Sequence, residues 1–458
     1  MSRLTLDELI AATQGRCRTG AGGKGRHTAI RRVVIDSRDV RPGDVFWALP
    51  GMRVDGAEFI GDAYRQGAAG TVSSRAAEPP AGRWAIEVHD AAEALVAAAR
   101  WQRNRFQGRV VAVTGSVGKT TTRQMIHAAL GAGQSGSASP RNYNNHVGLP
   151  LSMLGWRHDH DYAVVELGAS AAGEIAALAD ICRPQVGVIT QLGEAHLGTF
   201  GSREALAGAK AELLDALPRD GLAILSADDA RIRPLVGRCT ARVVTVGRSA
   251  EADYAATGVR SSGGLLEFTA NGHEMAVPVW GRHHLTSALM AIAVARHLGV
   301  TWPAITTGLA DFRSPQMRCE VREWRGATII NDCYNASPTA MRAALELLRD
   351  FDAAGRRIAL CGDMRELGPE TPQLHRQVGD QVVTVCGADV LIACGEHAEH
   401  VIAGARAAGM AEQCVFTCRD ACEAADVARQ VVTSDDVLLV KGSRAVGLER
   451  CLALLNVA

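Results

Sequence analysis

The segment GSVGKTT, at residues 115–121, combines the groups that a polyphosphate requires. A glycine-containing turn between a strand and a helix directs backbone N–H groups and the positive end of the helix dipole at one spot. Lys119 adds a positive charge, and Thr120 offers a hydroxyl group to a magnesium ion. We therefore predict a nucleoside triphosphate site. Its predicted residues are Gly115, Ser116, Gly118, Lys119, Thr120 and Thr121.

The match to the common phosphate-binding pattern is incomplete. That pattern is G-x-x-x-x-G-K-[ST], and Val113 stands where its first glycine belongs. The flanking segments nevertheless support the prediction, because residues 110–114 are typical of a buried strand and the apolar residues from Thr120 onward have helical spacing. An ordinary tight turn before a helix is the alternative interpretation.

Two further polar residues stand at the ends of predicted strands. Glu166 ends the apolar run YAVVE, and His196 lies just beyond the run VGVITQL. Binding sites in doubly wound sheets lie at the carboxyl ends of the strands, so both residues are expected near the phosphate loop. A carboxylate and an imidazole there can bind a cation beside triphosphate oxygens, although histidine is an unusual magnesium ligand. Taken singly, each residue is interpreted first as an ordinary polar residue at a strand end.

The elements that position these residues form three α/β units. Residues 1–85 mix short strands with one helix, and a Pro-rich stretch ends them. In residues 86–313, apolar runs alternate with helical patterns, which is typical of a doubly wound parallel sheet, and a polar, strand-rich insertion precedes the last long helix. Residues 314–458 repeat the alternation. The predicted fold is α/β with three domains: a small first domain, a central ATPase-like domain built on the phosphate loop, and a Rossmann-like third domain.

Composition excludes several classes of protein. The 458 residues contain 49 Lys and Arg and 49 Asp and Glu, so the formal net charge is zero and no basic face for nucleic acid is indicated. No stretch of eighteen consecutive apolar residues predicts a transmembrane helix, and the first sixteen residues lack the apolar core of a signal peptide. We expect a cytoplasmic protein. The twelve cysteines are scattered through a long chain, so we expect reduced thiols.

Two clusters resemble metal sites without the pattern of one. Cys414, Cys418 and Cys422 are four residues apart, but a strand is predicted at Val415 and a helix from Arg419, so their side chains would not converge. His158 and His160 precede a strand in what is predicted to be a solvated turn. Neither cluster is expected to bind a metal.

Seven segments in one order resemble the Mur ligases, and together they span nearly the whole chain. The segments are GSVGKTT, NYNNHVGLP, VELGAS, EAHLGTFGS followed by GAKAE, NDCYNASP, GDMRELG and VKGSR. Within that family the chain is similar to the type that adds D-alanyl-D-alanine to a UDP-N-acetylmuramoyl tripeptide. The resemblance implies an ATP-dependent peptide ligase of peptidoglycan precursor synthesis, which forms ADP, phosphate and an amide bond through an acyl phosphate.

The resemblance also assigns catalytic roles. Lys119 is expected to hold the β- and γ-phosphates, Thr120 one magnesium ion, and Glu166 and His196 a second. Lys210 matches a lysine that reacts with carbon dioxide to form a carbamate, an anionic group that supports a metal or positions the γ-phosphate; we expect Glu166 and His196 as its neighbours. The implied catalytic set is Lys119, Glu166, His196 and Lys210, and the implied metal set is Thr120, Glu166, His196 and Lys210.

The remaining implied sites bind nucleotide or substrate. Arg318, at the hinge to the third domain, and Asp332 are expected on the ATP side. The uridine diphosphate side is implied at Ser37 and Arg38, the muramoyl-peptide side at Asn142, Asn144 and Asn145, and the dipeptide side at Tyr334 and Asn335. The resemblance implies that residues from all three domains meet, with a hinge at residues 312–318. We expect a monomer.

Two segments depart from the family pattern, and three alternatives stay open. His284 and Ser287 stand where H-N-x-x-N supplies asparagines near the adenine, and Ala57 replaces a histidine. A sister ligase that adds a single diaminopimelate or lysine shares the loop and the lysine, but it carries D-N-P-R where this chain has GDMRELG. The others are a folylpolyglutamate synthase and a nucleotide-binding switch without ligase activity. The third residue of the tripeptide, diaminopimelate or lysine, is not determined by the sequence.

Overall fold

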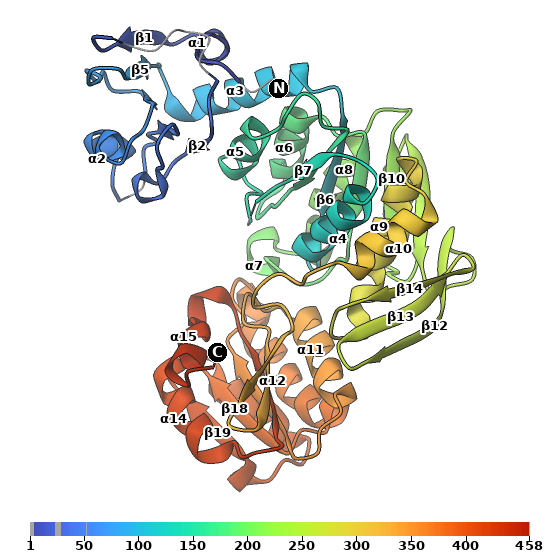
Figure 1. The fold of residues 1–458 in the computed structure, drawn as a ribbon. Coiled ribbons are helices and arrows are strands. Elements are labelled where there is room, and N and C mark those ends of the chain that lie inside the picture. Colours follow the sequence, from blue (N-terminus) through green and yellow to red (C-terminus); the bar gives the residue numbers. More distant parts are fainter. Residues whose placement is uncertain (1–3, 23–28, 52, 141, 458) are drawn as a thin grey trace.

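Three β-sheets follow one another along the chain and define three units (Figure 1). The computed structural model describes residues 4–22, 29–51, 53–140 and 142–457. The sheets contain five, nine and six strands. Each is covered by helices, so the prediction of an α/β fold with three units is confirmed. Among the described residues, no helix combines the length and the apolar composition needed to cross a membrane.

The first unit is a five-stranded sheet in the order β1-β5-β4-β3-β2, in which only the β1–β5 pair is antiparallel. Its strands are β1 (Arg16–Thr19), β2 (Val33–Val34), β3 (Val45–Trp47), β4 (Gly70–Ser73) and β5 (Trp84–Glu87). Its helices are α1 (Leu6–Thr13), η1 (Ser37–Asp39), η2 (Gly56–Phe59) and α2 (Ile60–Arg65). The short strands and the small sheet leave this unit with a small core of its own.

Helix α3 (Ala91–Arg105) joins the first unit to the second. Its first turns are buried against the first sheet, where the indole Nε1 of Trp47 donates a hydrogen bond of 2.8 Å to the carbonyl of Ala91. Further along, Ala99 belongs to the core of the central unit. One continuous helix therefore contributes to two cores, which fixes the first unit relative to the second.

The central unit is a nine-stranded sheet in the order β14-β13-β12-β11-β10-β9-β6-β8-β7. Its strands are β6 (Arg109–Thr114), β7 (Gly136–Ala138), β8 (Tyr162–Glu166), β9 (Val186–Ile189), β10 (Leu222–Ser226), β11 (Arg242–Gly247), β12 (Tyr254–Ser262), β13 (Leu265–Ala270) and β14 (His273–Val277). Strands β6 to β12 are parallel, and β13 and β14 extend the sheet antiparallel. The predicted doubly wound sheet is confirmed, and the strand-rich insertion belongs to the same sheet.

Helices cover both faces of this sheet, among them α4 (Lys119–Gly131) and α9 (Leu285–His297), which explains why the middle of β6, at residues 110–113, is apolar. Val111 and Val113 face the core beneath α4 and α9, whereas Val110 and Ala112 face the opposite core. Side chains that alternate between two buried faces leave no polar position in a central strand. The helices are α4 (Lys119–Gly131), α5 (Gly148–Leu154), α6 (Glu174–Cys182), α7 (Leu197–Phe200), α8 (Arg203–Asp215), η3 (Arg233–Arg238), η4 (Arg282–His284), α9 (Leu285–His297) and α10 (Trp302–Ala310).

The third unit is a six-stranded sheet in the order β15-β16-β20-β17-β18-β19. Its strands are β15 (Glu320–Trp324), β16 (Ala327–Asn331), β17 (Arg357–Gly362), β18 (Val390–Cys394), β19 (Val415–Cys418) and β20 (Val437–Lys441). All are parallel except β15, an antiparallel edge strand that the alternation in the sequence did not predict. The helices are α11 (Pro338–Asp350), η5 (Gly368–Glu370), α12 (Thr371–Gln381), η6 (Val382–Cys386), α13 (Ala398–Ala407), η7 (Glu412–Cys414), α14 (Ala421–Val431), η8 (Arg444–Val446) and α15 (Glu449–Leu454).

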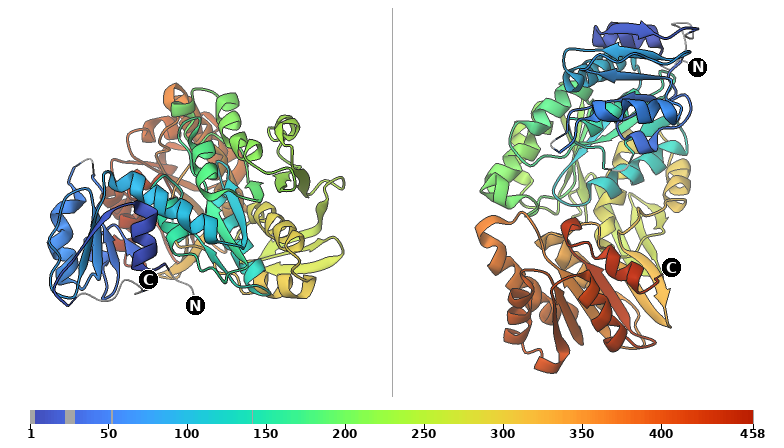
Figure 2. Two further views of the ribbon diagram at one scale, coloured as in Figure 1. Left: turned by 90° about the horizontal axis from the view of Figure 1, so that it is seen from above. Right: turned by 90° about the vertical axis from the view of Figure 1, so that its left-hand side faces the viewer.

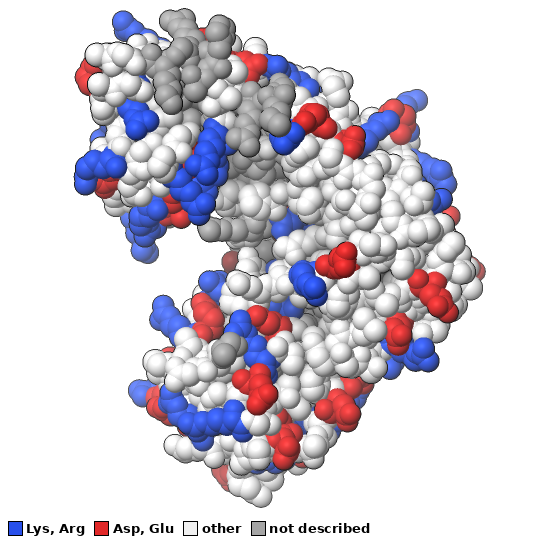
Figure 3. Space-filling view, in the orientation of Figure 1, with Lys and Arg blue, Asp and Glu red and all other residues white. Residues whose placement is uncertain are grey.

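The central unit lies between the other two, as the views in Figure 2 agree. The molecular surface is hollowed on one side between the first and third units, and basic side chains are visible inside the hollow (Figure 3). The second and third units touch through α7 and η5, where the backbone N–H of Gly198 donates 2.8 Å to the carbonyl of Glu366. The carboxyl ends of the central parallel strands therefore face the third unit.

Candidate active site

The phosphate loop connects β6 to α4, in the position predicted from the sequence. Gly115 and Gly118 have φ values of 141° and 85°, which side chains rarely adopt. A Cβ atom at Gly115 would also lie 2.1 Å from the hydroxyl oxygen of Thr190. The loop therefore requires glycine at both positions. The first glycine of the common phosphate-binding pattern is replaced by Val113, which lies within β6.

The residues that follow β9 support this loop. The N–H of Ser116 donates 2.8 Å to the carbonyl of Gln191, and the hydroxyl of Thr190 donates 2.6 Å to the carbonyl of Val117. The Ser116 hydroxyl donates 3.1 Å to the carbonyl of Gly193. The loop is thus held by side-chain and backbone hydrogen bonds to the neighbouring strand end.

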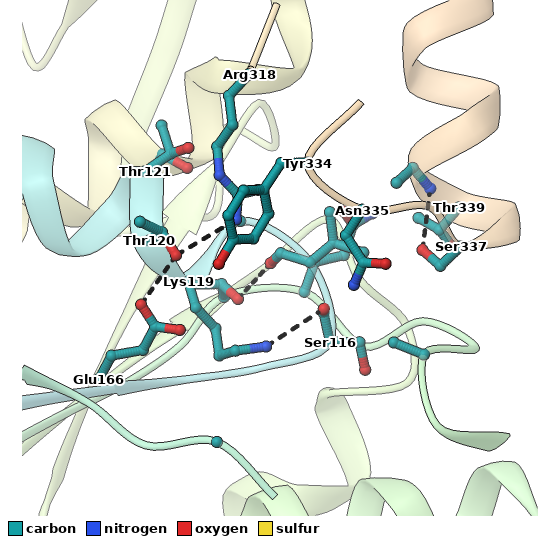
Figure 4. A pocket seen from close by; sticks show the side chains of 18 of the residues that line it. Ser116, Lys119, Thr120, Thr121, Glu166, Arg318, Tyr334, Asn335, Ser337 and Thr339 are labelled. Carbon is teal, nitrogen blue, oxygen red and sulfur yellow. Dashed lines mark hydrogen bonds between the residues drawn. The ribbon is translucent and has the colours of Figure 1, made fainter. Parts of the chain in front are cut away.

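Lys119 begins α4 and folds back over the loop. Its Nζ donates 2.8 Å to the carbonyl of Gly115 and 3.5 Å to that of Ser116 (Figure 4). Desolvation lowers the pKa of Lys119, the charge of Glu166 opposes that shift, and Arg318 adds to it. The ammonium group therefore lies in a poorly solvated position where an anion would be strongly attracted.

Thr120 and Glu166 meet beside the loop. The Thr120 hydroxyl donates a hydrogen bond of 2.9 Å to Oε2 of Glu166 (Figure 4). The Asn144 side-chain amide donates one of 2.8 Å to Oε1. Glu166 ends β8 and is 2 % exposed. A buried carboxylate beside a hydroxyl is a pair of hard oxygen donors, which suits Mg²⁺. Asn144, predicted on the substrate side, lies against this pair.

His196 lies before α7 and is held from the third unit. It has a left-handed φ of 65°, and its Nδ1 forms an ion pair with the carboxylate of Glu366. Burial lowers the pKa of His196, and the charge of Glu366 opposes that shift. The Glu366 contact occupies Nδ1, so Nε2 is the ring nitrogen left for another ligand. His196 lines the same cleft as Lys119 and Glu166.

Lys210 lies one layer behind the cleft wall. It is 1 % exposed on α8, its Nζ donates 3.0 Å to the carbonyl of Ala169, and it lies 5.3 Å from the ring centre of Phe200. Burial, with help from the charge of Lys119, lowers its pKa to about 7. The acidic groups whose charges oppose this shift are Glu174 and Glu212. Of the two neighbours expected for Lys210, His196 is close enough for the lysine charge to lower its pKa, and no contact between Lys210 and Glu166 is found among the described residues.

The third unit contributes a second group of charges. The Arg318 guanidinium lies 4.3 Å from the ring centre of Tyr334 and donates 3.5 Å to the Thr120 hydroxyl (Figure 4). Lys441 is buried at the end of β20, where its Nζ pairs with Oδ2 of Asp332 at 2.6 Å and donates 2.9 Å to the carbonyl of Asn335. All these side chains line the cleft.

His284 and Ser287 have different surroundings at the start of α9. His284 is 6 % exposed, and its Nε2 has no hydrogen-bond partner among the described residues. The Ser287 hydroxyl accepts 2.8 Å from the Thr122 hydroxyl, so it already joins α9 to α4. His284 therefore lines the cleft with one buried ring nitrogen that has no partner among the described residues, whereas the Ser287 hydroxyl is already engaged in the hydrogen bond with Thr122.

The predicted first-domain residues lie apart from this cleft. Ser37 and Arg38 are in η1, and the exposed Arg38 pairs with Asp36 at 2.6 Å.

Asn142 and Asn145 of the central unit line the cleft, but Oδ1 of Asn145 also accepts a hydrogen bond of 2.8 Å from the N–H of Gly148 at the start of α5. The proposed substrate contacts of these residues stay predictions.

The cleft has a volume of about 880 Å³ and is lined by the second and third units. That volume is in the range of pockets for small molecules and cofactors. It brings together most of the residues predicted from the sequence, namely Ser116, Gly118, Lys119, Thr120, Thr121, Asn142, Asn144, Asn145, Glu166, His196, His284, Arg318, Asp332, Tyr334 and Asn335. Two units must therefore be in contact for the site to exist.

Sequence reasoning missed three residues of this site. Lys441 was part of the quoted VKGSR, but it was given no role because it ends an apolar strand. Glu366 lies in GDMRELG and reaches His196 only across the contact between units. Glu194 accepts 2.7 Å from the Thr339 hydroxyl across the same contact. A lysine at the end of a buried strand was the only one of these signals visible in the sequence.

The positions of the cysteine and histidine clusters agree in part with the prediction. Cys414, Cys418 and Cys422 lie on η7, β19 and α14, three different elements. His160 Nδ1 forms a 2.8 Å hydrogen bond with the Ser137 hydroxyl, and His158 Nε2 lies 3.3 Å from Gln102. Both histidines are half-buried rather than in a fully solvated turn.

Comparison with known proteins identifies the family. Three family models match in sequence: the Mur ligase family, catalytic domain at residues 29–103, the Mur ligase middle domain at 113–295, and the Mur ligase, glutamate ligase domain at 317–444. The UDP-N-acetylmuramoyl-tripeptide–D-alanyl-D-alanine ligase of Bacillus subtilis is 35 % identical over 83 % of this chain and 82 % of its own. The Escherichia coli enzyme of the same name is 32 % identical over 100 % of this chain and 99 % of its own. The chain therefore belongs to the Mur ligase family.

Solved structures agree on the architecture. MurF from Acinetobacter baumannii superimposes with a TM-score of 0.85 at 29 % identity, covering 100 % of this chain and 99 % of its own. MurF ligase from Thermotoga maritima, solved in complex with ADP, gives a TM-score of 0.78 at 31 % identity, with 93 % and 97 % coverage. The three-unit arrangement is thus that of the MurF structures.

Proposed function

We propose that this chain is the ligase that joins D-alanyl-D-alanine to a UDP-N-acetylmuramoyl tripeptide and converts ATP to ADP and phosphate. The observation that carries the proposal is the juxtaposition of Lys119, Thr120 and Glu166 with Arg318 and Tyr334 of the third unit in one cleft. A phosphate loop faces a second domain there, as a two-substrate ligase requires. The similarity over the full chain to ligases of that name supports the substrate assignment.

In the proposed reaction the terminal carboxylate of the tripeptide attacks the γ-phosphorus of ATP, and ADP leaves. The amine of the dipeptide then attacks the acyl phosphate, and phosphate leaves from the tetrahedral intermediate as the amide forms. Lys119 and the loop N–H groups stabilise the negative charge that moves during the first step. Positioning and charge stabilisation are the main requirements, so no nucleophilic side chain is needed.

The residues beside the loop fit the magnesium that this family requires. Thr120 and Glu166 supply hard oxygen atoms, and His196 has Nε2 available. When bound, magnesium neutralises phosphate charge. Asn144 holds one oxygen of Glu166, which fixes the carboxylate for that role.

The surroundings of Lys210 fit the formation of a carbamate. Its pKa of about 7 leaves a large fraction of the amine neutral at physiological pH, and only the neutral amine attacks carbon dioxide. A nitrogen–carbon bond then forms, and the nitrogen releases one proton to solvent. The product carries a negative charge on a previously cationic side chain. We propose that this group supports the cleft from behind Ala169.

Glu366 is proposed as the positioning residue for His196. A carboxylate that accepts from one ring nitrogen fixes the tautomer and orientation of a metal-binding imidazole. Because Glu366 belongs to the third unit, contact between the units completes this arrangement. Glu366→Ala is expected to raise the magnesium concentration for half-maximal activity by about tenfold. Mn²⁺ binding measured by electron paramagnetic resonance should weaken by a similar factor, and Glu366→Gln should restore part of both losses.

Glu370 offers a matched control for this prediction. It lies four residues further along and pairs with Arg203 of the central unit at 2.9 Å, so it also crosses the contact between units. It has no contact with His196 among those described for it. Glu370→Ala should leave Mn²⁺ affinity unchanged. Equal weakening in both variants would mean that Glu366 serves only to dock the third unit.

A single assay tests the proposed function. Phosphate release is measured with ATP, UDP-N-acetylmuramoyl tripeptide and D-alanyl-D-alanine, with each acceptor omitted in turn. We expect release only in the complete mixture, and the amide product should be detectable by mass spectrometry. Phosphate release with UDP-N-acetylmuramoyl dipeptide and free diaminopimelate or lysine would instead establish the sister ligase. Folate and glutamate substrates test the folylpolyglutamate alternative, and nucleotide turnover without any product would indicate a switch.

The proposal includes an organisation in three domains. We assign residues 1–85 to the uridine-binding domain, 86–313 to the ATP-binding domain and 314–458 to the dipeptide-binding domain. A monomer located in the cytoplasm, where ATP and nucleotide-linked precursors are available, completes it.

A further inference from the structure

Three soft or borderline donor groups gather at the start of α9. One ligand atom from each of His283, His284 and Cys319 lies within 4.8 Å of the others. Nε2 of His283 and Sγ of Cys319 are 3.7 Å apart. Zinc bonds of about 2.1 Å to nitrogen and 2.3 Å to sulfur place tetrahedral ligands about 3.5 Å apart. The His283–Cys319 spacing already matches that value, and the other ligand pairs, within 4.8 Å, must close by about 1 Å at most to hold such an ion.

The chemical state of the three groups also suits a metal. His284 is 6 % exposed and its Nε2 has no hydrogen-bond partner among the described residues, so a buried acceptor faces this space. His283 is exposed, whereas His284 and Cys319 are buried, so the three groups form a site that opens to solvent on the His283 side. Burial raises the pKa of Cys319, and the charge of Asp332 adds to that effect. A bound dication would supply the charge that stabilises the thiolate.

The surrounding charges permit this ion. Two cations act on the cluster, Lys441 and Arg318. Asp332 pairs with Lys441 at 2.6 Å, and the Arg318 guanidinium lies over the Tyr334 ring and donates toward the Thr120 hydroxyl. The N–H of Cys319 donates 3.3 Å to Oδ1 of Asp332, so this carboxylate lies beside the cluster.

We propose that His283, His284 and Cys319 form a binding site for Zn²⁺ or a similar borderline divalent cation. Binding replaces the thiol proton of Cys319, which passes to solvent, and leaves one position for water. His283 and His284 come from the central unit and Cys319 from the start of the third, so the ion links two units at their hinge. In this loop Met317 and Cys319 both have left-handed φ values, of 58° and 52°.

The site shares the cleft with the phosphate loop, and His283, His284 and Cys319 all line it. The metal and the adenine end of a nucleotide therefore compete for His284. This second statement rests on the proposed nucleotide site, whereas metal binding itself does not. Because coupling between two ligands is reciprocal, each should weaken the other by the same factor.

Cobalt titration of the full-length protein tests the site. Co²⁺ reports thiolate coordination by a charge-transfer absorption band, and we expect one equivalent to saturate it. Cys319→Ser should abolish the band, and His284→Asn should weaken Co²⁺ binding at least tenfold. Cys422→Ser removes the exposed cysteine on α14 and should leave the band intact. Circular dichroism establishes that each variant is folded. If Cys319→Ser does not fold, the test of the site rests on His284→Asn.

Two results would overturn the site: no band in the unmodified protein, or a band that survives in Cys319→Ser and disappears in Cys422→Ser. Competition is measured with ADP in excess magnesium, using UDP at equal concentration as a control for chelation by phosphate. We expect ADP, and not UDP, to weaken Co²⁺ binding at least tenfold. A band insensitive to ADP would overturn the competition, while the loss of ligase activity alone would bear on neither.

Discussion

Replacing Lys119 with alanine should lower ligase turnover by about a hundredfold or more while the protein stays folded. Its ammonium group is poorly solvated, and its hydrogen bonds go to the carbonyls of the loop itself, Gly115 and Ser116. Loss of this charge removes an interaction that strengthens as the γ-phosphoryl group moves. The free energy of unfolding should change by about 1 kcal/mol or less, since the lost hydrogen bonds are offset by the removal of a desolvated charge. Phosphate release and urea denaturation measure the two quantities.

Binding of a uridine nucleotide is the control for this variant. The substrate contacts predicted at Ser37 and Arg38 lie outside the cleft that contains Lys119, so affinity for the uridine nucleotide should be retained. A folded Lys119→Ala protein with near-full turnover would contradict the phosphate-loop assignment.

Replacing Lys210 with methionine should abolish most ligase activity and stabilise the protein at neutral pH. The lysine pKa is about 7 in the folded chain and about 10.4 when unfolded, so between these values the unfolded state binds more protons. Folding at pH 7 therefore requires the lysine to give up part of its bound proton, which costs free energy. Methionine does not titrate, so its folding carries no such cost. We expect a gain of about 2 kcal/mol in unfolding free energy at pH 7 with carbon dioxide stripped, after allowing for the lost Ala169 hydrogen bond. The gain should shrink toward pH 10, where the unfolded lysine also becomes neutral.

The carbamate is tested directly by chemistry at the same position. Carbon-13 NMR with labelled bicarbonate should give one carbamate signal that Lys210→Met lacks. Activity of the unmodified enzyme should fall when carbon dioxide is removed and return with bicarbonate. Small carboxylic acids should partly rescue Lys210→Ala by occupying the anion position. Full activity of the alanine variant would reduce Lys210 to a structural lysine and leave the nucleotide site unaffected.

Local patterns predicted the fold well because each central strand is buried on both faces. Runs such as residues 110–113 are uniformly apolar for that reason, and Gly115, just after β6, has a positive φ that favours glycine. The antiparallel edge strand β15 was missed, since EVREW is mostly polar and only its last residue, Trp324, is buried, so it offers no uniform apolar run. Strand length and edge position are set by partners elsewhere in the chain.

The candidate site was predictable where residues act close to their own strand, and less so across units. Lys119, Thr120 and Glu166 follow from strand ends that share one edge of one sheet. Glu366 could not be predicted, because its contact with His196 depends on how two separately folded units dock. The immediate contacts of Lys210 could not be predicted for a related reason: α8 places it against Ala169 and Phe200, which no local pattern specifies.

The hydrogen bonds that join Thr190 and Gln191 to the phosphate loop bear on the thermodynamics of nucleotide binding: Thr190 donates to Val117, and the carbonyl of Gln191 accepts from Ser116. These bonds hold residues 115–117 through contacts that lie within the protein. A flexible loop would lose about 1–2 kcal/mol of conformational entropy for each residue that it orders around a phosphate. Here the loop is already ordered when the protein folds. Nucleotide binding therefore loses little of its favourable interaction energy to the ordering of the loop. Shortening the Thr190 side chain would therefore weaken binding through entropy, although Thr190 belongs to a neighbouring strand and donates to the loop rather than to the nucleotide.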